Sequence, residues 1–328
     1  MCNYIDLNRR KNKFNQLYKY RRVKLNINLR DLTMKKNKIS NNFHNDGCLI
    51  YSKEQNILDL KKKDIIQIFE KYGIIIFRNF NIDINKYFKF AQKFTKNFAN
   101  DAQRRKSRDE NKNIHEVDYG NNEMALHSEA SFSPTWPEIV WFYCNEIEDN
   151  SEGQTTFCDG IKLWDNLSLE EKNFFQKNPI KYSLEVPIKK NKKLNKKKWF
   201  INSIGSGDAL IDWKKGIFKV NQIRFAINPS RIPNKLAFSN HTLYKNTDET
   251  IKKWGLINDR QIPKKILDKI RKISDKLIYK HHWKKRDLIM LDNKRFMHGR
   301  TAYKKIYKRD ILNIQTAETN FGYGETTK

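Results

Sequence analysis

Cysteine is scarce in this chain, and the few cysteines present are not arranged in pairs. There are four in 328 residues, and no two of them form a CxxC motif. We therefore expect free thiols in a reducing compartment rather than a disulfide framework, at Cys2, Cys48, Cys144 and Cys158. A reducing compartment also suits Fe(II), which oxidises readily elsewhere.

A long hydrophobic run is also absent. No apolar stretch approaches the ~20 residues that a membrane-spanning helix needs. Residues 1–20 are polar and basic, and they lack the apolar core of a secretory signal. Together with the expected free thiols, this predicts a cytoplasmic protein that does not enter a membrane.

Acidic residues are few relative to basic ones, with 37 Asp and Glu against 66 Lys and Arg and a net charge of +29. Such an excess is common in proteins that bind nucleic acids. Lysine far outnumbers arginine, however, whereas proteins that read bases favour arginine for its paired donors. Lys, Asn and Ile share AT-rich codons, so genome composition explains the charge without a polyanion. We do not expect a nucleic acid partner, and the densest basic run, 189–198, is expected to be a solvated loop or hairpin tip.

Apolar residues make up 38% of the chain and are arranged as many short strands with a few helices. Helical spacing predicts helices over 57–73, around 87–94 and over 263–278, and a capping box of Ser168 and Glu171 predicts another helix start. Short β-branched and aromatic runs predict strands, at 74–77, 138–144, 155–158, 182–186, 199–200, 288–291 and 311–314. The fold class is therefore mainly β with helices, an antiparallel barrel or sandwich rather than a βαβ alternation. We expect one catalytic domain over 51–328, preceded by an arm or edge strand in 1–50.

The tripeptide His127-Ser128-Glu129 is the strongest functional signal. On a strand, residues i and i+2 point to the same face, so this imidazole and carboxylate can reach one ion. A third ligand has to come from elsewhere, and His298 follows a predicted strand that a closed β fold can bring alongside. Two histidines and one carboxylate form the facial triad of non-haem Fe(II) oxygenases, which leaves three coordination positions open.

The spacing of the histidines fits the common zinc sites less well. The separation of His127 and His298 is too long for a helical HExxH zinc site and wrong for a zinc finger. The remaining histidines lack a comparable context and are expected to have roles other than metal ligation: His44, His115, His241, His281 and His282.

Several segments carry a family pattern in the same order. Residues 127–144 read HSEASFSPTWPEIVWFYC, residues 152–155 read EGQT, and residues 287–301 read DLIMLDNKRFMHGRT. Arg309 stands eleven positions after His298. In this order the segments resemble the taurine dioxygenase (TauD/TfdA-like) family of Fe(II)/2-oxoglutarate oxygenases. Glu129 in place of the commoner Asp is similar to the clavaminate synthase-like branch of that family.

The resemblance implies a double-stranded β-helix (jelly roll) core flanked by α-helices. It implies His127, Glu129 and His298 as iron ligands, and Thr155 and Arg309 as contacts of the 2-oxoglutarate C5 carboxylate. An arginine fork matches a carboxylate with two donors. The implied reaction uses O2, releases succinate and CO2, and oxidises a C–H bond of a small-molecule substrate.

The sequence defines the substrate less well. We expect hydroxylation of an unactivated C–H bond of an amino acid or related metabolite, free or tethered to a carrier protein. Desaturation, cyclisation or epimerisation at the same iron site is an alternative, and a basic nucleic-acid-binding protein on a jelly-roll scaffold, using 189–198, is the alternative from another class. Asn313 stands where taurine dioxygenases place a second arginine, which argues against a sulfonate substrate. Candidate substrate contacts precede the first ligand: Arg104, Arg105, Arg108, Asn121, Asn122 and Glu123. No oligomeric state is indicated.

Overall fold

The structure is a computed structural model, and strands are the main elements in the part of the chain that it describes. The described residues are 38–40, 47–99, 105–111, 113–117, 120–133, 135–148, 152–187, 208–212, 217–244, 251–304 and 308–322.

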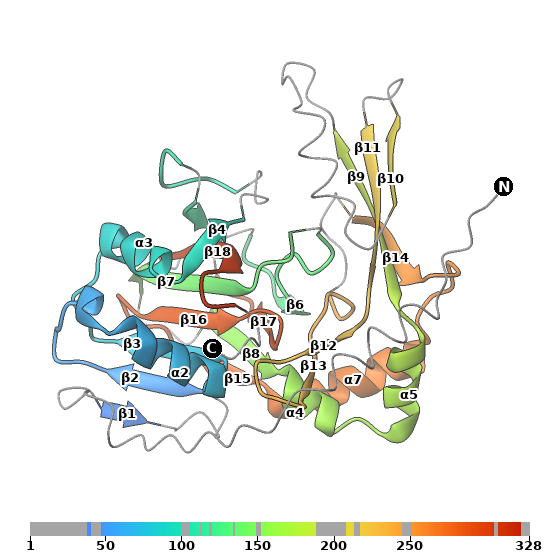
Figure 1. Ribbon diagram of the computed structural model, residues 1–328, viewed down its shortest axis with the longest axis horizontal. Coiled ribbons are helices and arrows are strands. Elements are labelled where there is room, and N and C mark those ends of the chain that lie inside the picture. Colours follow the sequence, from blue (N-terminus) through green and yellow to red (C-terminus); the bar gives the residue numbers. More distant parts are fainter. Residues whose placement is uncertain are drawn as a thin grey trace.

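The largest sheet forms one layer of the molecule (Figure 1). Its strands are β1 (Lys38–Ser40), β2 (Cys48–Tyr51), β3 (Ile74–Arg78), β4 (Thr95–Phe98), β5 (His115–Glu116), β7 (Ile139–Ile147), β16 (Leu288–Asp292) and β18 (Arg309–Thr319). They follow the order β1-β2-β3-β16-β7-β18-β4, and β5 pairs with β18 beside this path. Among the strands described in this sheet, β2 and β3 are the one parallel pair, and the other neighbours are antiparallel. Two strands of the segment 1–50, β1 and β2, thus form one edge of this sheet.

A second, smaller sheet faces the first. It consists of β6 (Met124–His127), β8 (Thr155–Asp159), β15 (Tyr279–His281) and β17 (Phe296–Arg300), in the order β15-β8-β17-β6. On the central strands β3, β7 and β16, every second residue packs against side chains of the small sheet, because successive residues of a strand point to opposite faces. The shared core includes Val140, Phe142, Ile289, Phe157 and Phe296.

Two helices cover the outer face of the large sheet. They are α2 (Lys62–Tyr72) and α3 (Ile84–Gln92), and their apolar side chains pack on Trp141 and Met290. The sequence predicted one helix from residue 57, but the chain forms a short 3-10 turn, η1 (Ile57–Asp59), and then an extended step at Leu60 before α2 begins. Asn56 caps this turn by accepting from the Leu58 N–H. Gly73 ends α2 in the left-handed region, with a φ of 70°, as its position predicted.

Three helices cover the outer face of the small sheet. They are α4 (Gly160–Asp165), α5 (Leu169–Lys177) and α7 (Lys264–Leu277), and they share a core with Cys158 and Met297. The predicted capping box at the start of α5 is confirmed, and α7 starts directly after Pro263 as its periodicity predicted.

The remaining strands form a sheet at the upper right of Figure 1 and a short hairpin pair. The sheet has the order β10-β11-β9-β14, with β9 (Ile180–Pro187), β10 (Asp208–Asp212), β11 (Ile217–Arg224) and β14 (Ile251–Leu256), and the pair is β12 (Ile227–Pro229) with β13 (Leu236–Phe238). The basic run 189–198 and the strand predicted at 199–200 lie outside the described residues.

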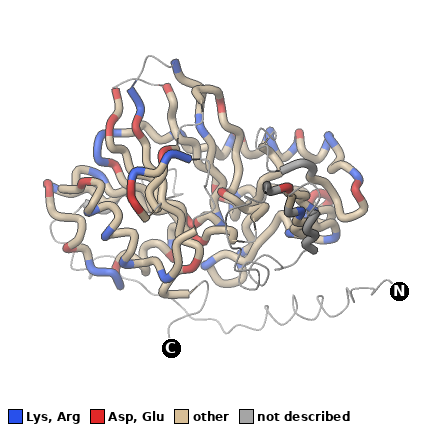
Figure 2. The backbone as a smooth tube through the Cα atoms, turned by 90° about the horizontal axis from the view of Figure 1, so that it is seen from above, with Lys and Arg blue, Asp and Glu red and all other residues tan. Residues whose placement is uncertain are grey.

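The whole is mainly β with helices, as the sequence predicted. No helix in the described part of the chain is both long and apolar enough to cross a membrane. Cys48, Cys144 and Cys158 are buried free thiols, and burial raises the pKa of Cys48 and of Cys144 to about 12. Cys2 lies outside the described residues. Basic positions are spread over many elements and are interspersed with acidic ones (Figure 2).

Candidate metal and cosubstrate site

Strand pairing brings two remote histidines together. In the small sheet β17 lies between β6 and β8, and its register places His298 opposite His127 on β6 and opposite Phe157 on β8. Phe142 of the large sheet contacts the His298 ring, with centroids 5.2 Å apart. The two histidines therefore lie in the space between the sheets, at the end of β6.

Glu129 completes a compact group of three side chains that could hold a metal ion. One ligand atom from each of His127, Glu129 and His298 lies within 4.8 Å of the others. Glu129 Oε2 is 3.9 Å from His127 Nε2 and 3.5 Å from His298 Nε2. These separations suit three donors around one ion, since metal–ligand bonds of this kind are about 2.0–2.2 Å long.

The backbone between the first two ligands differs from the predicted strand. Strand β6 ends at His127, and Glu129 lies in a turn in which Ala130 has a φ of 49°. Asn293, from the turn between β16 and β17, holds this turn. Its side chain accepts from the Glu129 N–H at 2.8 Å and donates to the Glu129 C=O at 2.9 Å. The carboxylate is thus aimed by a tertiary contact and not by strand alternation.

Burial and neighbouring charge favour, in His127 and Glu129, the protonation states that metal binding needs. Burial is the main cause that lowers the pKa of His127 well below its ordinary value, and the imidazoles of His298 and His241 lower it further. Burial alone would raise the pKa of Glu129, but Arg105 and the two imidazoles lower it on balance. Neutral imidazoles beside an ionised carboxylate are the forms that ligate metals.

The tautomer of His127 also fits ligation. Its Nδ1 lies 2.9 Å from the Ala125 C=O, which leaves Nε2 as the acceptor toward Glu129 and His298. His298 Nδ1 is buried and has no hydrogen-bond partner among the described residues. A nitrogen–nitrogen–oxygen donor set of this kind suits a divalent iron with open positions.

The residues predicted to bind the cosubstrate begin two strands of the facing sheets. Thr155 begins β8 and Arg309 begins β18, and both are buried. Arg309 Nε donates to the C=O of Gly153, two residues before Thr155, and its guanidinium lies 5.6 Å from the centre of the Tyr303 ring. The Trp283 indole donates to the Thr155 hydroxyl at 2.9 Å. The Thr155 hydroxyl oxygen therefore accepts from Trp283, and its own hydrogen is not used in this bond.

Of the candidate substrate contacts that the structure describes, Arg105 contacts the three-residue group, whereas Arg108, Asn121 and Asn122 make hydrogen bonds or ion pairs elsewhere. Arg105 reaches the site and donates to Glu129 Oε1 at 2.9 Å. Arg108 instead pairs with Glu116 and Asp310. The backbone C=O of Asn122 accepts from Arg300, and the Asn121 side chain donates to the Tyr303 C=O. Arg104 lies outside the described residues.

Other histidines do not join the group in the part of the chain that is described. His241 comes nearest, since its ring centroid is 5.3 Å from that of His127, and Phe132 and Tyr244 contact it. His281 is buried against Asp287. His44 lies outside the described residues.

Two contributors to the site were not predicted in these roles. Asn293 had no signal beyond its place in the Asp-Asn turn before His298. Arg105 was expected only as a substrate contact, because sequence spacing cannot reveal that a loop arginine reaches a carboxylate 24 residues away.

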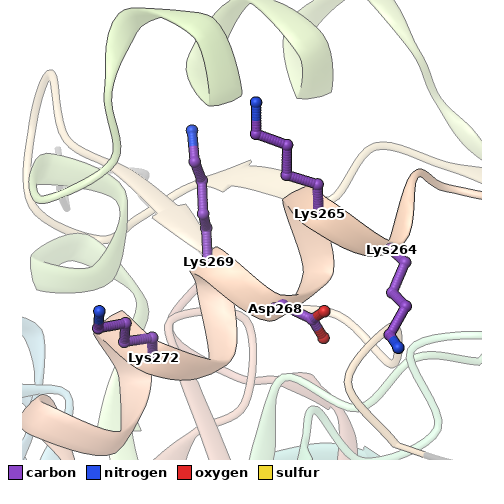
Figure 3. A pocket seen from close by; sticks show the side chains of 5 residues that line it. All are labelled: Lys264, Lys265, Asp268, Lys269 and Lys272. Atoms are coloured by element: carbon purple, nitrogen blue, oxygen red, sulfur yellow. The ribbon is translucent and has the colours of Figure 1, made fainter.

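A surface pocket lies elsewhere, on the exposed side of α7 (Figure 3). It is lined by Lys264, Lys265, Asp268, Lys269 and Lys272. None of these side chains belongs to the His127–Glu129–His298 group, so this pocket has no part in the candidate metal site.

Comparison with known proteins assigns the family. The sequence profile described as "Taurine catabolism dioxygenase TauD, TfdA family" matches residues 37–315. No curated protein shows significant similarity to the chain.

Similar solved structures share the fold at low identity. One is AAD-2 in complex with Mn(II) and N-oxalylglycine, with 14% identity, a TM-score of 0.57, and coverage of 88% of this chain and 100% of that one. Another is PvcB from Pseudomonas aeruginosa, with 14% identity, a TM-score of 0.55, and coverage of 82% and 85%. A second PvcB structure describes it as an Fe, alpha-ketoglutarate dependent oxygenase from an isonitrile synthetic pathway. The chain belongs to the TauD/TfdA family and is an Fe(II)- and 2-oxoglutarate-dependent dioxygenase.

Proposed function

We propose that this dioxygenase hydroxylates an unactivated C–H bond of an amino acid or related small metabolite, with Fe(II) held by His127, Glu129 and His298. The observation that carries the proposal is the convergence of these three side chains from β6, the turn after it, and β17. Three protein ligands leave three positions for the cosubstrate and O2.

The chain's own residues have separable tasks in this proposal. His127 offers Nε2 because its Nδ1 is engaged by the Ala125 C=O. Asn293 aims Glu129 through its backbone. Once bound, iron and 2-oxoglutarate supply the oxidising chemistry, which releases succinate and CO2. Burial of the two imidazoles, each about 5% exposed, limits the access of water to that chemistry.

We assign the far carboxylate of 2-oxoglutarate to Arg309 and Thr155. The guanidinium is held from one side by the Gly153 C=O, so its remaining donors point elsewhere in a fixed plane. The Thr155 hydroxyl already accepts from Trp283 and is free to donate. Arg309 contacts Gly153, two residues before Thr155, and a buried cation together with a hydroxyl donor suits a carboxylate, because charge-assisted hydrogen bonds are stronger than neutral ones.

The substrate class rests on the residues around the metal group. Glu129 in place of Asp supports an amino acid or a derivative, either free or tethered to a carrier protein. Arg104, Arg108 and Asn122 stay as candidate contacts, to which Arg105 is added because it reaches the site. The same residues are compatible with desaturation, cyclisation or epimerisation, which differ only in how the substrate radical is resolved.

Fold and location are part of the same proposal. We propose that the two facing sheets are the halves of a jelly roll, and that residues 51–328 form a single catalytic domain in a cytoplasmic protein, with β1 and β2 from the preceding segment added at the edge of its large sheet. Low sequence identity to the similar structures is common in this kind of fold, where function depends on the site.

A coupled succinate assay tests the proposal. Protein loaded with Fe(II) without oxygen is mixed with 2-oxoglutarate and air, first alone and then with each amino acid. We expect slow succinate release alone, faster release with the true substrate, and a product that has gained one oxygen atom. Loss of two hydrogens would indicate desaturation or cyclisation instead. His127→Ala should abolish both rates, and a variant that still forms succinate would refute the ligand set.

A further inference from the structure

Arg105 contacts the oxygen of Glu129 that does not face the imidazoles. Its Nη2 donates to Oε1 at 2.9 Å, while Oε2 is the oxygen 3.9 Å and 3.5 Å from the two histidine nitrogens. Both side chains are largely buried, with 14% of Arg105 and 12% of Glu129 exposed. The two carboxylate oxygens therefore have different partners, one turned toward the imidazoles and one toward a guanidinium.

The guanidinium of Arg105 also contacts the large sheet. Arg105 Nη1 lies 3.4 Å from the Asn313 Oδ1 on β18, and the Asn313 amide lies 3.4 Å from the Trp141 C=O. Asn313 is fully buried. The loop that carries Arg105 is also tied to β18, because β5 pairs His115 with Asn313. The position of the Arg105 fork is thus fixed relative to the strand rather than left to solvent.

Glutamate needs such a contact more than aspartate would. Asn293 fixes only the backbone of Glu129, and the side chain has one more rotatable bond than aspartate. If Oε1 were free to turn, both oxygens could face the metal. A two-oxygen carboxylate would then occupy one of the three positions that the cosubstrate and O2 require.

We propose that Arg105 is a positioning residue that keeps Glu129 a one-oxygen metal ligand and so keeps a coordination position open for 2-oxoglutarate. This inference rests on the proposed ligand set. It gives the segment that carries Arg105 a role in the site, since a shift of Arg105 would change the number of open positions on the metal.

The test uses Mn(II), which binds such sites without turnover, together with 2-oxoglutarate. Mn(II)-loaded Arg105→Met should bind 2-oxoglutarate on the order of tenfold more weakly, as expected for loss of an outer contact to a metal ligand. Water-proton relaxation of the Mn(II) protein should report fewer exchangeable waters than in the parent. Arg105→Lys, which keeps the charge and one donor, should recover part of both losses.

Matched variants distinguish the effect of the Arg105–Glu129 hydrogen bond from the effect of removing a positive charge near the site. Lys106→Gln removes a positive charge one residue away, on a side chain that is 77% exposed, and should leave 2-oxoglutarate affinity unchanged. In a Glu129→Asp background the shorter carboxylate loses its contact with Arg105, so Arg105→Met should have little further effect. An equal loss in both backgrounds, or a loss no larger than that of Lys106→Gln, would overturn the proposal.

Failure of the ligand set would be recognised separately. His127→Ala should lose Mn(II) binding. If it does not, the proposed metal centre is wrong. If it does, and Arg105→Met behaves as Lys106→Gln, only the positioning role of Arg105 is wrong.

Discussion

At the scale of single residues, the site depends on side chains that touch ligands rather than on the ligands alone. Asn293 is fully buried and makes hydrogen bonds with the backbone of Glu129, with the Pro137 C=O and with Ser128. Replacing it removes partners from several buried polar groups at once, and each unsatisfied group costs about 1–3 kcal/mol.

We therefore expect Asn293→Ala to lower the free energy of unfolding by about 2–5 kcal/mol and to weaken Mn(II) binding. Asn166→Ala is the control, because Asn166 is exposed and its side chain donates to the Lys162 C=O within α4. Thermal unfolding and Mn(II) titration measure the two effects. A loss of stability without a loss of metal affinity would show that the turn does not aim Glu129.

The second prediction concerns Arg309 and the binding of 2-oxoglutarate. Arg309→Lys keeps the charge but loses the planar fork and the Nε contact with the Gly153 C=O. We expect the apparent KM for 2-oxoglutarate to rise about tenfold or more, since hydrogen bonds to charged groups contribute about 1.5–3 kcal/mol. Arg286→Lys, at an exposed surface pair with Glu54, is the matched control. An unaltered KM would contradict the assignment of Arg309.

At the scale of elements, β17 determines whether the metal group forms. Gly299 follows His298 directly, and a Cβ at this position would lie 2.4 Å from the Met124 C=O and 2.9 Å from Thr156 Oγ1. These atoms belong to β6 and β8, the two neighbours of β17. The strands can approach so closely only because this residue has no side chain.

Gly299→Ala should push β6 away from β17 and so separate His127 from His298. We expect lower stability and a loss of Mn(II) affinity larger than that of any surface variant. Gly120→Ala serves for comparison, because its added carbon meets no atom within 4 Å although its φ of 66° carries a strain on the order of 1 kcal/mol. Comparable metal affinity in the two variants would show that strand spacing does not set the site.

Helices and strands could be predicted from the sequence where the pattern of apolar residues along a short segment was clear. The strands at 74–77, 138–144 and 288–291 are apolar runs, and α7 has apolar residues at helical spacing, so short-range pattern was sufficient. The approach of His298 to His127 followed from the family resemblance, not from any local pattern. The contacts of Arg105 and Asn293 could not be predicted, because they join loops whose paths depend on the assembled sheets.

At the scale of the whole molecule, one buried cluster ties the two sheets together. Arg78 at the end of β3 makes two hydrogen bonds with Asp287, at 2.8 and 2.6 Å, and Asp287 lies 3.1 Å from His281 Nε2 on β15. Arg78 ends β3 and Asp287 directly precedes β16, both strands of the large sheet, whereas His281 belongs to β15 of the small sheet. Burial alone would raise the pKa of Asp287, but its bonds with Arg78 and His281 lower it on balance. Burial lowers the pKa of His281.

These pKa shifts predict that the folded protein becomes less stable at acidic pH, because the Arg78–Asp287–His281 contacts between the sheets are weakened. A histidine whose pKa is lower in the folded than in the unfolded state binds a proton first in the unfolded chain, so its folded form loses stability as pH falls below about 6.5. Between that pH and the folded pKa, His281 alone should contribute up to about 1.4 kcal/mol of lost stability per pH unit. Asp287 adds to the loss at lower pH, when its carboxylate is protonated.

Urea unfolding of the parent and of His281→Gln, followed from pH 8 to pH 5, isolates this contribution, because the other titrating groups are common to both proteins. The variant should be less stable at pH 8, since Asp287 loses its contact with the imidazole and Trp283 loses its ring contact with His281. Its stability should nevertheless fall less steeply below pH 6.5, so the two curves converge as the pH drops. Parallel curves would mean that His281 binds its proton equally in both states, and the link between the sheets would then be insensitive to pH.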